Sequence, residues 1–161
     1  MKELFDVHCH MVPGVDDGAA DLEESLEMLK MQHEDGVRKI IITPHYRRRM
    51  FETPAKKVHE QFLKLQEAAK KEYPDMSLYL GCELHSNMDL QDILEKRKYV
   101  TMAGSSYVLL EFSEGDSAQH IRERVYNVLS CGYEPIIAHV ERYQATLKCV
   151  GFPSDLVDMG A

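Results

Sequence analysis

The sequence is short of basic residues, paired cysteines and long apolar runs, and each shortage excludes a class of protein. It has 19 lysines and arginines against 27 acidic residues, a formal net charge of −8, which argues against a general binder of nucleic acids or of anionic membranes. The four cysteines are scattered and form no Cys-x-x-Cys motif, so we expect reduced thiols and a cytoplasmic protein. No apolar run approaches transmembrane length, and no apolar segment follows the first residues, so we expect neither membrane insertion nor a signal peptide.

The 161 residues are enough for one sizeable core, and we expect a single domain over residues 1–161. Apolar and β-branched runs predict strands around Leu4–His10, Val37–Thr43, Leu78–Cys82, Tyr107–Leu110 and Pro135–Ala138. Helical spacing and capping residues predict helices between Asp21 and Gly36, after Thr53 with Pro54 at the first position, over Leu90–Lys96, over Ile121–Val128, and over Ser154–Met159. Because strands and helices alternate, we expect an α/β fold of parallel strands joined by crossover helices.

Every predicted strand ends at or beside a residue that can bind a metal ion. His8 and His10 share one face of the first strand, because side chains alternate along a strand. The carboxyl ends of parallel strands gather at one edge of the fold, so these residues are expected to lie together. The candidate ligands at the five strand ends are His8 and His10, His45, Glu83, Glu111 and His139.

A mixture of imidazoles and carboxylates suits Mn²⁺, Zn²⁺ or Fe²⁺ better than Ca²⁺ or Mg²⁺. With this many ligands we expect more than one ion, and clustered ions favour hydrolysis of phosphate esters or of amides. A phosphate substrate would use arginine as a forked donor. Arg142 is the best candidate because it lies three residues after His139, whereas Arg47 and Arg48 belong to a basic loop that could simply be solvated.

These residues stand in motifs that resemble the polymerase and histidinol phosphatase (PHP) family. Within it, the chain is similar to the manganese-dependent bacterial protein-tyrosine phosphatases of capsule and exopolysaccharide operons. The matching motifs span nearly the whole chain and are Asp6–His10, Pro13–Gly18, Thr43–His45, Met50–Pro54, Gly81–Leu84, Tyr107–Phe112 and Ala138–Tyr143.

The resemblance implies a distorted (β/α)₇ TIM-like barrel with Mn²⁺ as the cofactor and up to three ions. One ion would be held by His8, His10 and Glu83, a second by Glu83, Glu111 and His139, and a third by Asp17 and His45. Arg142, helped by Arg47 or Arg48, would hold the substrate phosphate while a metal-bound hydroxide attacks phosphorus. The substrate would be a phosphotyrosine protein, typically a bacterial tyrosine kinase. Cys9 lies between two ligands, so it faces away from the ions and is not expected to be a nucleophile.

The sequence departs from the family pattern at its end. The family has a late Asp-x-His and two further strands, and no Asp-x-His follows His139 here. We therefore expect an incomplete barrel of about five parallel strands, with two of the three metal positions short of a ligand. An open edge favours self-association, and Ile136 and Ile137 on the last strand are expected to be most exposed.

Two other functions remain open from the sequence. One is a PHP phosphoesterase for a small molecule, similar to histidinol phosphatase. The other is a catalytically silent protein that binds metal and hydrolyses neither substrate.

Overall fold

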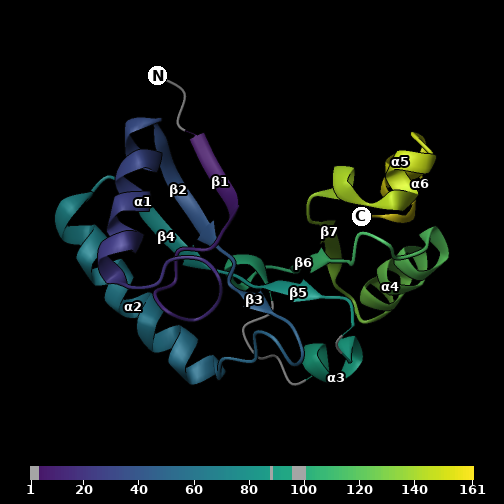
Figure 1. The fold of residues 1–161 in the computed structure, drawn as a ribbon, viewed down its shortest axis with the longest axis horizontal. Helices are drawn as coiled ribbons and strands as arrows, with labels where there is room; N and C mark the ends of the chain where they lie inside the picture. Colours follow the sequence, from purple (N-terminus) through teal and green to yellow (C-terminus); the bar gives the residue numbers. More distant parts are fainter. Residues whose placement is uncertain (1–3, 88, 96–100) are drawn as a thin grey trace.

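The computed structural model describes residues 4–87, 89–95 and 101–161, and Figure 1 shows their strands and helices alternating along the chain. The strands are β1 (Leu4–Cys9), β2 (Val37–Ile42), β3 (His45–Tyr46), β4 (Ser77–Leu80), β5 (Glu83–His85), β6 (Tyr107–Glu111) and β7 (Glu134–Ile137). The helices are α1 (Leu22–Glu34), α2 (Ala55–Glu72), α3 (Leu90–Glu95), α4 (Ala118–Ser130), α5 (Gln144–Lys148) and α6 (Phe152–Met159), with 3₁₀ turns η1 (Met102–Gly104) and η2 (Val140–Arg142).

The strands form two parallel sheets, with the orders β1-β2-β4 and β3-β5-β6-β7. The predicted α/β class with parallel strands is confirmed, and the described residues form no closed barrel. The five predicted strands become seven because the second and third are each interrupted. The chain still pairs across both interruptions: Gly81 N–H donates to Ile42 O at 2.8 Å, and Glu83 N–H donates to Pro44 O at 3.1 Å. The two sheets therefore meet along one continuous seam.

The position of Glu83 differs from the prediction. We expected it to end a strand over Leu78–Cys82, whereas it is the first residue of β5 and pairs with His45 in β3. The bend lies at Gly81, where an added Cβ would stand only 3.0 Å from side-chain atoms of Ile41 and Met102. A side chain at this position would force these neighbours to shift by a few tenths of an ångström. Glu83, two residues after Gly81, begins β5 in the second sheet.

The helix ends follow the predicted capping at α1 but not at α2. Asp21 accepts the backbone N–H of Glu24, and Glu24 accepts the N–H of Ala20, so both carboxylates cap the start of α1. The prediction that Thr53 caps α2 is wrong: the cap residue is Pro54, and the Thr53 hydroxyl instead donates to Val15 O at 2.7 Å. That hydrogen bond ties the loop before α2 to the loop after β1.

The remaining helix predictions agree closely with the structure. The helix expected over Leu90–Lys96 is α3, of which Lys96 lies outside the described residues. The C-terminal helix begins at Phe152, two residues before the predicted start. No helix among the described residues has both the length and the apolar character needed to cross a membrane.

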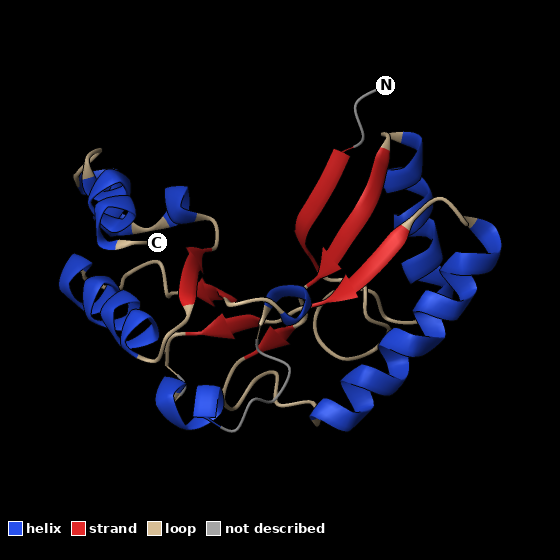
Figure 2. Ribbon diagram, turned by 180° about the vertical axis from the view of Figure 1, so that it is seen from behind, coloured by secondary structure: helices blue, strands red, loops and turns tan. Residues whose placement is uncertain are grey.

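Each sheet has its own hydrophobic core, and Figure 2 shows the helices divided between them. Side chains of α1 and α2, such as Leu29 and Leu65, pack on the first sheet with Ile40 and Ile42. Side chains of α3, α4 and α6 pack on the second sheet with Leu84 and Leu110. The metal-ligand candidates lie at the seam between these two cores.

The exposed edge differs from the expectation. Ile136 and Ile137 are partly covered, because Ile136 packs near Leu109 and Ile137 packs against the core formed with α4 and α6. The most exposed apolar strand residues are instead those of β1, where Leu4, Phe5 and Val7 are half or more exposed. The prediction that the last strand carries the most exposed apolar surface is wrong.

Candidate metal centre

All seven predicted metal ligands line one open pocket of about 500 Å³ at the seam between the sheets, together with Arg142. As expected for parallel strands, some of these ligands lie at carboxyl ends: at or after the end of β1, at the end of β6 and after β7. His45 and Glu83 instead begin β3 and β5, and Asp17 lies in the loop after β1. Arg47 and Arg48 are not among the lining residues: Arg47 is half-buried and its backbone pairs with Phe51, and Arg48 is exposed. The pocket residues are His8, His10, Asp17, His45, Glu83, Glu111, His139 and Arg142.

The carboxylate of Glu83 is the centre of this group. Its side chain is 1% exposed, and four imidazoles surround it. Oε2 lies 3.0 Å from His8 Nε2, 3.1 Å from His10 Nε2 and 3.3 Å from His45 Nδ1. Oε1 lies 3.0 Å from His139 Nε2. Burial opposes ionisation, but hydrogen bonds from His10, His139 and His8 outweigh it and hold the pKa of Glu83 well below its usual range.

Asp16 contacts two of the pocket histidines, although the sequence pattern did not single it out. Its buried Oδ2 lies 2.9 Å from His10 Nδ1 and accepts the backbone N–H of His45 at 2.9 Å, while Oδ1 accepts the N–H of Gly18 at 3.1 Å. A carboxylate on the second ring nitrogen is the usual way in which a metal-binding histidine is oriented, so His10 Nε2 is left facing the pocket. Burial disfavours the charged imidazole, but its hydrogen bonds to Asp16 and Glu83 raise the pKa of His10 to about 10.

The loop that carries Asp16 closes tightly on His10. A Cβ at Gly18 would lie 2.1 Å from the carbonyl oxygen of His10, so only glycine fits. Ala19 N–H also donates to His10 O at 3.1 Å. The adjacent acids Asp16 and Asp17 between glycines were the available sequence signal, but spacing alone did not indicate which of them faces His10.

His45 and Glu111 carry buried atoms that the protein does not satisfy. Within the described residues, His45 Nδ1 and Glu111 Oε2 are buried without a hydrogen-bond partner, and they lie 3.7 Å apart. Phe51 stacks on the His45 ring with the centroids 5.1 Å apart and an angle of 11°. Buried polar atoms are normally paired, so an imidazole nitrogen and a carboxylate oxygen left facing each other beside Glu83 fit a cation.

Three groups of donors lie close enough to share an ion, with the donor atoms of each group within 4.8 Å of one another. The first is the predicted set His8, His10 and Glu83. The predicted pair Asp17 and His45 is joined by His10. Of the predicted trio Glu83, Glu111 and His139, the two carboxylates are grouped with His45 instead of His139. His139, the third member of that predicted trio, places Nε2 3.0 Å from Glu83 and 4.0 Å from Glu111.

Other candidate groups lie away from the pocket. The Cys9 side chain is buried in the core between the first sheet and its helices, where burial and the nearby carboxylates of Asp6 and Asp16 raise the pKa of its thiol. His33 on α1 pairs with Asp75 at 3.0 Å. These positions agree with the expectation that Cys9 faces away from the ligands.

Comparison with known proteins gives the same family as the motifs. The family described as "Capsular polysaccharide synthesis, CpsB/CapC" matches residues 4–161. Tyrosine-protein phosphatase CpsB of Streptococcus pneumoniae is 40% identical over 157 residues, which cover 98% of this chain and 65% of that protein. Tyrosine-protein phosphatase YwqE of Bacillus subtilis is 30% identical over 158 residues, which cover 98% of this chain and 62% of that protein.

A solved structure shares the fold. It is described as one of the crystal structures of YwqE from Bacillus subtilis and CpsB from Streptococcus pneumoniae, "unique metal-dependent tyrosine phosphatases". It superposes with a TM-score of 0.88 at 30% identity, over 98% of this chain and 64% of that chain. The chain thus spans just under two thirds of the length of these relatives. Since the family matches nearly every described residue, the chain belongs to the CpsB/CapC family of capsular polysaccharide synthesis.

Proposed function

We propose that this chain is a metal-dependent phosphatase that hydrolyses phosphotyrosine in proteins and acts in the control of capsular or exopolysaccharide synthesis. The observation that supports it most is the Glu83 carboxylate with four imidazole nitrogens within 3.3 Å, in a pocket that also contains Glu111, Asp17 and Arg142. The names of the relatives, tyrosine-protein phosphatases CpsB and YwqE, give the chemistry that we assign to this pocket.

We assign the metal ligands as His8, His10, Asp17, His45, Glu83, Glu111 and His139, and Mn²⁺ as the ion. The donor set supports this choice, because imidazoles mixed with carboxylates suit Mn²⁺, Zn²⁺ or Fe²⁺. Divalent ions held there would supply an acidified water and neutralise charge on the phosphoryl group. Asp16 would orient the ring of His10. Glu83, which contacts four imidazoles, would bring their ring nitrogens together around the ions.

Arg142 would bind the substrate phosphate. It follows His139 at the mouth of the pocket, its side chain is 63% exposed, and its nearest acidic partner is Glu141 at 3.6 Å. A guanidinium presents a planar fork of donors that matches phosphate oxygens and cannot bind a metal ion. Arg47 and Arg48 belong to the loop that also carries Phe51, and we propose that they contact the protein substrate around the phosphotyrosine.

We further propose that the substrate is a bacterial tyrosine kinase and that the reaction occurs in the cytoplasm. The four cysteines are all unbridged, which supports a reducing compartment. The net charge of −8 disfavours nucleic acid as a partner.

The experiment measures hydrolysis of two classes of phosphate ester by the chain, first after its metal is removed with a chelator and then after Mn²⁺ is added back. We expect no hydrolysis after chelation, recovery with added Mn²⁺, and a higher kcat/KM for a phosphotyrosine peptide than for small alkyl phosphates. Arg142→Ala should keep its bound metal and lose about 10- to 100-fold in kcat/KM, the equivalent of one charged hydrogen-bond pair. Arg124→Ala, on α4 outside the pocket, is the matched control.

The other outcomes identify the alternatives. A preference for small alkyl phosphates would favour a small-molecule PHP phosphoesterase. Metal binding with no hydrolysis of either substrate would favour a catalytically silent metal-binding protein. Full activity after exhaustive chelation would contradict the proposal itself.

A further inference from the structure

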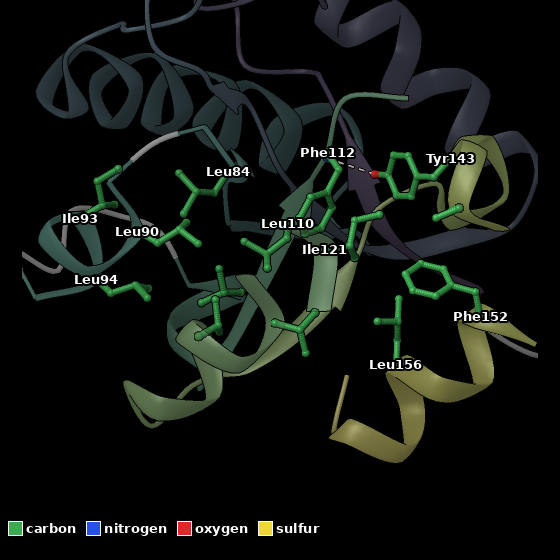
Figure 3. Packing of buried hydrophobic residues seen from close by; sticks show 14 residues of the cluster. Leu84, Leu90, Ile93, Leu94, Leu110, Phe112, Ile121, Tyr143, Phe152 and Leu156 are labelled. Atoms are coloured by element: carbon green, nitrogen blue, oxygen red, sulfur yellow. Dashed lines mark hydrogen bonds between the residues drawn. The ribbon is translucent and has the colours of Figure 1, made fainter. Parts of the chain in front are cut away.

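Tyr143 is a fully buried side chain whose hydroxyl lies directly behind the pocket. It is 0% exposed and lies between η2 and α5. The hydroxyl donates to Ala138 O at 2.7 Å and accepts the backbone N–H of Phe112 at 3.2 Å, the bond drawn in Figure 3. The same oxygen lies 3.2 Å from His139 Nδ1. One phenol therefore contacts the residue after β6 and two residues after β7.

Counting protons decides the direction of the contact with His139. A tyrosine hydroxyl has one proton and can accept through its oxygen lone pairs. Its proton goes to Ala138 O, because a carbonyl oxygen can only accept. The contact with His139 therefore needs a proton on Nδ1, which donates to Tyr143. The Nδ1-protonated ring is the one whose Nε2 can bind a metal ion.

The backbone at this point also needs support. His139 has φ +33 and ψ +49, in the left-handed region that side-chain-bearing residues seldom adopt. The hydrogen bond from Tyr143 to the carbonyl of Ala138 acts on the peptide that joins Ala138 to His139. The Tyr143 ring packs edge-on against Phe112 at 5.8 Å and 81°, which fixes the phenol in place.

The bond to Phe112 extends the effect to the other strand. Phe112 directly follows Glu111, the carboxylate with a buried unpaired oxygen. The Tyr143 hydroxyl thus contacts the pocket donor His139 directly and bonds to the residue that follows a second donor, Glu111. Removing it would loosen the ends of β6 and β7 together.

We propose that Tyr143 is a positioning residue for the metal centre: it holds the His139 ring with Nδ1 protonated and Nε2 facing the pocket, and it fixes the strand end that carries Glu111. This proposal rests on the metal centre assigned under "Proposed function". Tyr143 itself lies behind the pocket and touches neither ion nor substrate. Tyr143 would therefore act on the bound ion through the ligands His139 and Glu111.

The test is Tyr143→Phe, which removes the hydroxyl and keeps the ring. Zn²⁺ affinity is measured by competition with a chelator on the folded chain, because Zn²⁺ is diamagnetic and therefore suits NMR. We expect affinity to fall about 10- to 100-fold, the usual effect of losing an outer partner of a metal-bound histidine. Tyr126→Phe, on the exposed face of α4, should leave affinity unchanged.

A second measurement begins with the wild-type chain, and its wild-type result does not depend on the variant folding. In the Zn²⁺-loaded chain, the Nδ1–H proton of His139 should give a slowly exchanging NMR signal, and Tyr143→Phe should lose it. Unchanged Zn²⁺ affinity in a folded Tyr143→Phe, or a wild-type His139 Nδ1–H that exchanges freely with water, would overturn the role of Tyr143 alone. A wild-type chain that binds no Zn²⁺ would overturn the metal centre as well.

Discussion

The two sides of the candidate metal pocket differ in how the protein satisfies its donors. On the side of β1, His10 is held between the carboxylates of Asp16 and Glu83. On the side of β6, His45 Nδ1 and Glu111 Oε2 are buried without a hydrogen-bond partner among the described residues. An unsatisfied buried polar group costs roughly 1–3 kcal/mol. We infer that the first side is preorganised by the protein, whereas the second depends on a cation to be satisfied.

The largest expected effect comes from Glu83, because it belongs to both sides. Glu83→Gln keeps the shape of the side chain and removes the charge that faces four imidazoles. We expect metal affinity to fall by more than about 100-fold, beyond the range seen when an outer partner is lost. Isothermal titration with Mn²⁺ measures this. The control is Glu67→Gln, an exposed carboxylate on α2 that pairs with Lys71, and an equal loss in both variants would contradict the assignment.

Breaking the second side alone should produce the next largest effect. His139→Ala removes a ring 3.0 Å from Glu83, and we expect the number of bound ions to fall. His33→Ala is the matched histidine control, because His33 pairs with Asp75 and does not line the pocket. Metal content is measured by mass spectrometry after dialysis. The same stoichiometry in both variants would show that His139 is not a ligand.

The preorganised side should respond more weakly to loss of its outer partner. Asp16→Asn keeps the size of the side chain but weakens its hold on His10 Nδ1, at 2.9 Å. Metal affinity is expected to fall about 10- to 100-fold, with the number of ions unchanged at saturating Mn²⁺. Chelator competition measures the affinity. A variant as tight as the wild type would mean that Asp16 serves only to fold the loop after β1.

The smallest expected effect is on the stability of the metal-free chain as pH changes. The pKa of His10 is raised to about 10 from 6.5, so its contribution to stability is complete below about pH 6.5 and is lost as pH rises toward 10. The pKa of Asp16 is lowered, so its contribution is present above the ordinary aspartate range and is lost as pH falls below it. Thermal midpoints in chelator, compared with those of Asp16→Asn, should show a flatter curve in the variant. Parallel curves would contradict this coupling.

The sequence predicted the site better than it predicted the strands. His8, His10, Glu111 and His139 could be found because strand alternation and strand ends are local features of the chain. Glu83 was found for its residue type, but its place at the start of β5 was not, because the chain around Gly81 packs closely against Ile41 and Met102 from distant segments. Local spacing contains no information about such contacts.

Asp16 was missed for the same physical reason. Its contact with His10 depends on the loop folding back through Gly18 onto the backbone of His10. The wrong prediction that Thr53 caps α2 is a similar case, since the Thr53 hydroxyl donates to Val15 O rather than capping the helix that follows. Tertiary hydrogen bonds decided both positions.

The most direct test of the central claim is a Mn²⁺ titration of the chelated chain in which bound metal and phosphotyrosine hydrolysis are measured in the same samples. We predict that at least one ion binds per chain, that hydrolysis rises with occupancy, and that Glu83→Gln abolishes both together. Hydrolysis that is present in the chelated chain and does not change as Mn²⁺ binds would contradict the account.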